Sequence, residues 1–302
     1  MIKQIRHRLG LAWWRLKVKT GIRTPEQDRV EAMRPIFALR YEATKDVLIG
    51  RGVELGAGPN PQRLPRAATC EYFDIRNESE IEQHFGKGIS YEVHPIEQIP
   101  QRFPEGVDFL LAHNVLEHTS DPIKALLEWF SWVRDGGVVV ISMPDMNYLP
   151  ADAGRLVPPL EHILLDHVLE RDDDSFESRE HIYSFLLGWW DHVVVDSDKA
   201  AYVQHCLSEA RRSGHDLHWH ALDCERGTEV IEAAGLFGGI KLEFIRICNT
   251  ESEPIATLGE TIYVFRVDQA SPLADSSTRT ELLTLAKRLA AASKKLEQAA
   301  NI

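Results

Sequence analysis

The stretch Val53-Glu54-Leu55-Gly56-Ala57-Gly58 joins a short apolar run, an acidic residue and two glycines one position apart. A glycine-rich turn after a strand lets backbone approach a ligand closely, and an acidic residue about 20 positions later can hydrogen-bond ribose hydroxyls. Asp74 stands at that distance, at the end of the next apolar run. The pattern predicts a pocket for a nucleoside cofactor, although a Gly-x-Gly pair also ends many ordinary strands.

The residues after this turn indicate that the ligand carries no phosphates. The last glycine of a dinucleotide fingerprint would fall near Pro61, and no phosphate-binding lysine follows. Nothing in the stretch would therefore cradle a pyrophosphate or a triphosphate.

Further motifs follow in an order that is typical of one family. They are Ile99-Pro100, the run from Val107 to His118, Asp121-Pro122, Gly136-Gly137 and Ile141 to Pro144. The series resembles the class I S-adenosylmethionine-dependent methyltransferases, in the branch whose fourth strand ends in Leu-Glu-His. The resemblance covers roughly residues 50 to 146. It implies S-adenosylmethionine as the cofactor and methyl transfer as the activity.

The same resemblance implies the cofactor contacts. These are Glu54, Gly56, Ala57 and Gly58 at the methionine end, Asp74 at the ribose, Ile96 beside the adenine, and His113 and Asn114 on the floor of the pocket. In many relatives an aspartate binds the adenine amine, and this aspartate stands before the Leu-Pro pair. Pro95 stands at that position here, between His94 and Ile96.

Alternating apolar runs and helical patterns predict an α/β fold with a parallel sheet. The resemblance implies a Rossmann-like, seven-stranded, mostly parallel sheet flanked by helices, whose last two strands form an antiparallel pair. The expected strands are 52–55, 71–75, 90–93, 107–113, 138–142, 240–247 and 261–267. A helix is expected to begin at Asp121, with Pro122 in its first turn and Gly136-Gly137 at its end.

The chain is expected to have three parts: a basic N-terminal helical segment (1–45), a methyltransferase domain (46–268) with a helical acceptor-binding insertion after the fifth strand (146–220), and a helical C-terminal tail (269–302). No acidic residue precedes Glu26, and basic residues alternate there with apolar ones. That segment could cover the cofactor pocket or lie on an anionic membrane surface. The tail could cap the domain or pair with another subunit.

Charge and composition argue against some functions. The net charge of −12 disfavours binding along a nucleic-acid backbone, which relies on clustered Lys and Arg. No apolar run approaches the ~20 residues that a membrane span needs. Four cysteines without CxxC spacing disfavour a zinc knuckle or a disulfide framework. The expected location is the cytoplasm, at the inner face of the membrane if the basic segment binds it.

Histidines concentrate in the insertion, where eight of the 13 lie between residues 162 and 220. Such a concentration suggests a polar concave site or a metal, although a single histidine is more often a half-buried residue with a hydrogen-bond partner. His162 and Asp166 are expected to share one helix face, and His218 and His220 to share one face if their segment is extended. The substrate-binding candidates are Asp145, Arg155, Asp166, His218 and His220.

Methyl transfer to an alcohol needs a group that removes a proton, and histidine suits that task at neutral pH. The candidates for this base are His118, His162 and His181. A divalent metal is the alternative, because Asn114 to His118 resembles the Glu-x-x-Glu-His motif of metal-dependent ubiquinone-pathway and small-RNA methyltransferases. Its ligands would be Glu117, His118 and one insertion histidine, and Asn114 replaces the first glutamate.

The order of Asp145, Arg155, His162, Asp166, His181 and His218 to His220 more loosely resembles bacterial methyltransferases associated with surface-glycan synthesis. The first hypothesis is therefore O-methylation of a sugar or a glycan-linked acceptor. Two alternatives stay open: a methyltransferase of a quinone-like or natural-product acceptor, and a non-catalytic cofactor-binding scaffold in glycan assembly.

Overall fold

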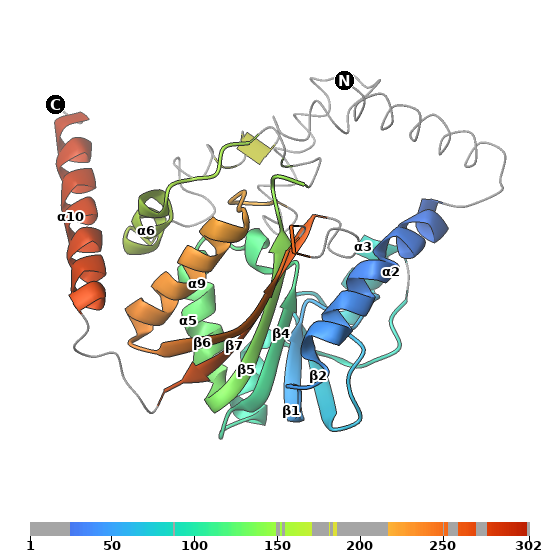
Figure 1. Cartoon of the computed structure of the whole chain (residues 1–302). Coiled ribbons are helices and arrows are strands. Elements are labelled where there is room, and N and C mark those ends of the chain that lie inside the picture. Colours follow the sequence, from blue (N-terminus) through green and yellow to red (C-terminus); the bar gives the residue numbers. More distant parts are fainter. Residues whose placement is uncertain are drawn as a thin grey trace, which may run out of the picture.

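A seven-stranded sheet in the order β3-β2-β1-β4-β5-β7-β6 forms the centre of the molecule (Figure 1). The computed structural model describes residues 25–86, 88–148, 152, 155–170, 181, 184–185, 217–249, 251–252, 259–269 and 277–300. The strands are β1 (Gly50–Leu55), β2 (Ala68–Asp74), β3 (Val93–Pro95), β4 (Val107–His113), β5 (Val133–Pro144), β6 (Lys241–Cys248) and β7 (Glu260–Asp268).

The pairing of the strands confirms the predicted seven-stranded, mostly parallel sheet, although β3 lies at Val93–Pro95 and not at the expected 90–93. β1 pairs in parallel with β2 and β4, β2 with β3, and β4 with β5, whereas β7 is antiparallel to both β5 and β6. Because parallel strands end at the same edge of a sheet, the segments after β1, β2, β3 and β4 meet there, and ligands of open α/β sheets bind at that edge.

Helices cover both faces of the sheet (Figure 1). They are α2 (Pro25–Thr44), α3 (Glu78–Phe85), α4 (Ile99–Arg102), α5 (Pro122–Trp132), α6 (Leu160–Val168), α9 (Cys224–Gly238) and α10 (Ser277–Ala300), with 3-10 turns η1 (Ile96–Gln98) and η2 (Leu116–His118). Along β4, Leu110 and Ala112 pack on the side of α5 and α9, whereas Phe109 and Leu111 pack on the side of α2. Burial on both faces explains why this strand is a continuous apolar run.

The predicted end of the helix that follows β4 is wrong. Asp121 caps α5 as expected, because its Oδ1 accepts a hydrogen bond of 2.9 Å from the backbone N of Lys124. The helix ends at Trp132, before Gly136-Gly137, since Val133 is extended and pairs directly with Val107. β5 therefore begins five residues before the predicted start at 138, and the two glycines lie within it.

The C-terminal helix α10 packs against α6 and α9, with Leu282, Leu285 and Leu289 on the core. This contact agrees with a capping role, and pairing with another subunit stays a prediction. The first 24 residues and most of the 146–220 insertion lie outside the described residues, so the lid or membrane role of the N-terminal segment and the domain boundaries stay predictions. In the described part of the chain, no helix has both the length and the apolar character of a membrane span.

A buried ion pair joins α2 to β7. Arg40 Nη2 lies 2.7 Å from Glu260 Oε1, and the two residues are 5% and 3% exposed. Removing one partner leaves an uncompensated buried charge, which costs far more than the intact pair contributes. We expect Arg40→Met to lower the free energy of unfolding by about 3 to 5 kcal/mol in urea titrations.

The double variant Arg40→Met/Glu260→Leu should recover most of this loss, since neither charge then remains buried. Lys45→Met is the control: it breaks the exposed pair between Lys45 and Glu42 at the end of α2, and it should change the urea midpoint little. A double variant as unstable as Arg40→Met would contradict the charge-burial explanation.

Candidate functional site

The glycine turn after β1 touches the loop after β4. Gly56 and Gly58 have φ angles of +61° and +53°, which L side chains rarely adopt. A Cβ added at Gly56 would lie only 2.9 Å from Val115 Cγ2. The turn is tied to β2 by a hydrogen bond of 2.9 Å from Gly56 N to Phe73 O. Both glycines are therefore required by conformation, and the turn faces the segment that leads to Glu117.

The residues predicted for the cofactor follow the strand order along this edge. Ile96 follows β3, Asp74 ends β2, Gly56 and Ala57 follow β1, and Asn114 follows β4. Their order along the sheet edge matches the order predicted for the parts of the cofactor, from the adenine through the ribose to the methionine. Asp74 is 8% exposed, and its Oδ1 accepts a hydrogen bond of 2.9 Å from Arg76 N.

A polar network fixes the loop that contains the glycine turn. Both carboxylate oxygens of Glu54 accept from Gln62 N, at 3.1 and 3.0 Å, and the Gln62 amide donates to Thr44 Oγ1 at 2.8 Å. The Gln62 amide oxygen contacts His113 Nε2, and His113 Nδ1 lies 2.8 Å from Ser142 Oγ. Glu54 and His113 therefore hold the loop that carries the glycines. Gln62 was missed by the sequence analysis, because a single polar residue after Pro61 gives no signal.

Burial controls the charge state of this network. It raises the pKa of Glu54 to about 7 and lowers the pKa of His113 well below its usual value. His113 is consequently a neutral imidazole. Because the Gln62 amide oxygen only accepts, His113 Nε2 carries the proton and Nδ1 accepts from the Ser142 hydroxyl.

Asn114 presents a polar atom with no partner in the described residues. Its φ of +55° is left-handed, a conformation that Asn tolerates better than most residues. The backbone N donates to Ser142 O at 2.8 Å, whereas the side-chain Oδ1 is buried without a hydrogen bond. Buried polar atoms are normally paired, so an orphan beside the glycine turn fits a ligand donor.

Glu117 and His118 of η2, which follows β4, lie close to His218 from the segment before α9; we call these three residues the Glu117 cluster. One potential ligand atom from each lies within 4.8 Å of the others. Neither carboxylate oxygen of Glu117 is hydrogen-bonded in the part of the chain that the structure describes, and burial raises its pKa to about 7. His118 Nδ1 donates to Leu217 O at 3.0 Å, and His218 Nδ1 donates to Asp152 Oδ2 at 2.8 Å. Both rings are thus fixed with Nδ1 protonated.

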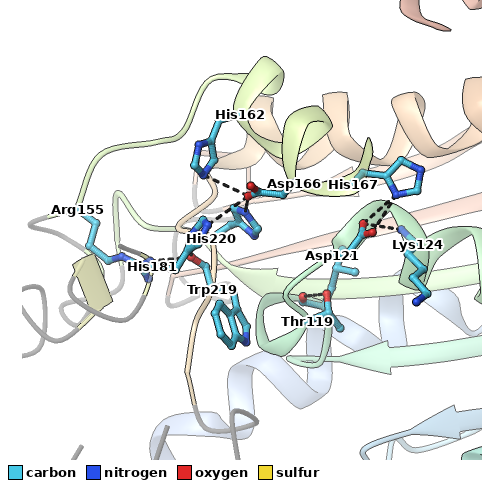
Figure 2. Close-up of polar contacts among 11 residues, drawn as sticks. Thr119, Asp121, Lys124, Arg155, His162, Asp166, His167, His181, Trp219 and His220 are labelled. Carbon is cyan, nitrogen blue, oxygen red and sulfur yellow. Dashed lines mark hydrogen bonds and ion pairs between the residues drawn. The ribbon is translucent and has the colours of Figure 1, made fainter. Parts of the chain in front are cut away.

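A second group, His162, Asp166, His181 and His220, is called the Asp166 cluster (Figure 2). His162 and Asp166 share one face of α6, as predicted, with Nε2 and Oδ2 3.3 Å apart. Burial lowers the pKa of His220 to about 4. Burial alone would raise the pKa of Asp166, but the hydrogen bonds with His181 and His220 hold it below its usual range.

The backbone of Trp219 connects the two clusters. Its N donates to Glu117 O at 2.8 Å, and its carbonyl accepts from His181 Nδ1 at 2.9 Å and from Arg155 Nη2 at 3.0 Å. Residues 217–220 form bends, so the condition under which His218 and His220 would share a face is not met. Each ring enters a different cluster instead.

The predicted substrate-binding residues separate into four places, and His218 belongs to the Glu117 cluster. Arg155 donates to Asp152 Oδ1 and to the carbonyl groups of His218 and Trp219, which makes it a support for that segment. Asp166 and His220 belong to the Asp166 cluster. Asp145 accepts from Asn147 N at 3.0 Å and, at 3.5 Å, from Thr261 Oγ1, and so lies in neither cluster.

Comparisons with known proteins give one family match. Residues 54–141 match the model described as "Methyltransferase domain". This stretch runs from the end of β1 into β5 and contains every predicted cofactor contact. No curated protein matches the sequence.

Several solved structures are similar to the chain. One is a SAM-dependent methyltransferase from Thermotoga maritima, described as a possible histamine N-methyltransferase, with 16% identity over 85% of this chain and 100% of that chain (TM-score 0.41). An S-adenosylmethionine-dependent methyltransferase from Clostridium acetobutylicum has 11% identity over 78% and 92% (TM-score 0.40). The CurJ carbon methyltransferase has 17% identity over 76% of this chain and 51% of that chain (TM-score 0.36), so this chain spans about half of its length.

The raised pKa of Glu54 predicts that stability falls as pH rises. Between pH 4.5 and about 7 the folded protein keeps a proton that the unfolded chain has released, so unfolding becomes easier by at most roughly 3 kcal/mol across this window. In Glu54→Gln this contribution disappears, whereas hydrogen bonding to Gln62 N remains possible for the amide oxygen. Urea titrations at pH 5 and pH 7.5 should therefore show a smaller pH effect in the variant. Equal pH effects in both proteins would show that Glu54 does not titrate in this way.

Proposed function

We infer that this chain, which carries a class I S-adenosylmethionine-dependent methyltransferase domain, transfers the methyl group to a hydroxyl of a sugar or a glycan-linked acceptor. The family match over residues 54–141 supports methyl transfer. The observation that carries the proposal further is the position of the Glu117 cluster. It follows β4, whose loop touches the glycine turn at Gly56 and Val115.

The residues at the sheet edge fit the cofactor. Gly56 and Gly58 leave their turn without side chains, Asp74 offers a carboxylate at the ribose position, and Asn114 Oδ1 offers a buried acceptor. Bound S-adenosylmethionine would supply an electrophilic methyl group on a sulfonium. The protein then has to align the acceptor oxygen and remove its proton as the new bond forms.

His118 is the base that the geometry favours. Its Nδ1 donates to Leu217 O, so Nε2 carries the lone pair that can accept a proton. The buried Glu117 carboxyl lies beside it and would stabilise the imidazolium when ionised. His162 and His181, the other two candidates, both direct Nε2 towards Asp166.

The choice of a sugar acceptor rests on the polar character of the site and on the looser sequence resemblance. Glu117, His118, His218 and Asp152 offer several hydrogen-bonding groups, which suits a polyhydroxyl acceptor better than a flat apolar one. A quinone-like or natural-product acceptor remains the alternative. A cofactor-binding scaffold would bind S-adenosylmethionine without turnover, which distinguishes it experimentally.

A divalent cation at the Glu117 cluster is the second candidate, because both oxygens of Glu117 lack a hydrogen bond within the described ranges. Glu117, His118 and His218 would hold it, and hydrogen bonds to Leu217 O and Asp152 orient the two rings as is usual for ligand histidines. A cation there would supply Lewis-acid polarisation of the acceptor oxygen. Under this candidate His118 would be a ligand instead of the base.

The proposal also includes a location. The reaction would occur in the cytoplasm, and at the inner face of the membrane if the basic segment before Glu26 contacts anionic lipids instead of covering the cofactor pocket. Pairing of two chains through the C-terminal tail belongs to the same proposal.

Calorimetric titration with S-adenosylmethionine and S-adenosylhomocysteine tests the cofactor site. Gly56→Arg should abolish binding, since its side chain enters the space occupied by Val115 and the turn. Gly136→Arg is the matched control: its φ is also left-handed, at +72°, nothing lies within 4 Å of its added Cβ, and it lies near the start of β5, away from the carboxyl edge. Absence of binding by the unmodified chain would reject the methyltransferase proposal.

Methyl transfer to a panel of nucleotide sugars and glycans tests the base. His118→Gln should lower kcat roughly 100-fold or more while leaving the affinity for S-adenosylhomocysteine unchanged. His167→Gln is the control, because that histidine bonds to Asp121 outside both clusters. Unchanged turnover in His118→Gln would remove His118 from the mechanism. Loss of turnover on chelation, restored by added Mg²⁺ or Mn²⁺, would favour the cation at the Glu117 cluster.

A further inference from the structure

The Asp166 cluster brings three imidazole nitrogens onto a single carboxylate oxygen. Asp166 Oδ2 lies 3.3 Å from His162 Nε2, 3.2 Å from His181 Nε2 and 3.2 Å from His220 Nε2. One potential ligand atom from each of the four residues lies within 4.8 Å of the others. The residues come from α6, from His181 and from the bends before α9, and Figure 2 shows the rings converging on Asp166.

The cluster is also buried. The side chains of Asp166 and His220 are each 2% exposed, that of His181 is 9% exposed, and that of His162 is 24% exposed. The His181 and His220 ring centroids are 4.6 Å apart, and those of His162 and His181 are 5.0 Å apart. Positive charges on all three rings at this spacing would repel each other strongly in a site with little water.

The hydrogen bond between His181 and the Trp219 carbonyl determines which ring nitrogen of His181 is protonated. Nδ1 lies 2.9 Å from the Trp219 carbonyl oxygen, which only accepts, so Nδ1 carries a proton. In neutral His181 the lone pair of Nε2 then points at Asp166 Oδ2, and two acceptors face each other at 3.2 Å. A positive charge between them removes this conflict. A single metal ion does so for all four residues at once.

The observed spacing matches a known coordination geometry. Zinc in a tetrahedral site has bonds to nitrogen and oxygen of about 2.0–2.1 Å, which places neighbouring ligand atoms about 3.3 Å apart. The three distances from Asp166 Oδ2 have this length. Imidazole ligands suit zinc and other late first-row metals, whereas Ca²⁺ and Mg²⁺ take oxygen ligands. The bond from His181 Nδ1 to a backbone carbonyl is the outer contact that ligand histidines usually make.

We propose that His162, Asp166, His181 and His220 bind one Zn²⁺ ion in a four-coordinate structural site. Four protein ligands leave no open position, as is typical of structural zinc. The ion joins α6 to the segment 217–220 and thereby positions Trp219, whose N is bonded to Glu117 O. Zinc binding does not depend on whether the chain transfers methyl groups, so the two proposals can fail separately.

Measuring the zinc content of the protein tests this proposal directly. Full-length protein purified without chelator should contain one zinc per chain by plasma mass spectrometry. After removal of zinc with a strong chelator, Co²⁺ should restore one equivalent and give the intense visible absorption of four-coordinate cobalt. Mg²⁺ and Ca²⁺ should not compete. The unmodified chain is decisive by itself: failure to bind one equivalent of Zn²⁺ or Co²⁺ overturns the proposal, whatever the variants do.

Two variants test the ligands, and two more serve as controls. Asp166→Asn and His181→Ala should lose the zinc equivalent and the rise in Tm that added zinc gives the stripped wild-type protein. His167→Ala, on the same helix, should keep both. Glu117→Gln should also keep the zinc, because it belongs to the other cluster. Zinc that is lost in Glu117→Gln but kept in Asp166→Asn would assign the ion to the Glu117 cluster and overturn the proposal.

Discussion

The peptide groups of Trp219 are the constraint on which the histidine clusters depend. The N of Trp219 fixes the turn that carries Glu117, and its carbonyl holds His181 and Arg155. Because His218 and His220 flank it, the same residue sets where each ring enters its cluster. Trp219 is itself 2% exposed, so the segment is anchored by apolar burial as well as by hydrogen bonds. Hydrogen bonds and burial together therefore fix the position of this short irregular segment.

The site concentrates buried acidic groups in a way that costs stability. Glu54 and Glu117 each have their pKa raised to about 7 by burial, whereas the histidines around Asp166 hold its pKa low. Glu54 is satisfied by Gln62 N, which explains its structural role beneath the glycine turn. Glu117 has no such partner in the described part of the chain. An unpaired buried carboxyl is expensive in a purely structural setting, so its presence agrees with a role in chemistry or ligand binding.

Sequence patterns predicted the sheet well and the site only in part. The run 107–113 was assigned correctly because apolar residues on both faces leave a clear signal. The end of α5 was missed because the pairing of Val133 with Val107 is a tertiary contact that overrides the glycine signal further along. His162 and Asp166 could be paired from helical spacing alone. The approach of His220, 54 residues from Asp166, and the division of His218 and His220 between two clusters depend on the bends at 217–220, which no periodicity encodes.

The central claim is that the methyl group is presented to the Glu117 cluster at the end of β4. A crystal structure of the chain with bound S-adenosylhomocysteine tests it most directly. We expect the ribose at Asp74, the methionine part over Gly56 to Gly58, and the sulfur facing His118 and His218. A ligand bound elsewhere, or a sulfur turned away from these two histidines, would contradict the account.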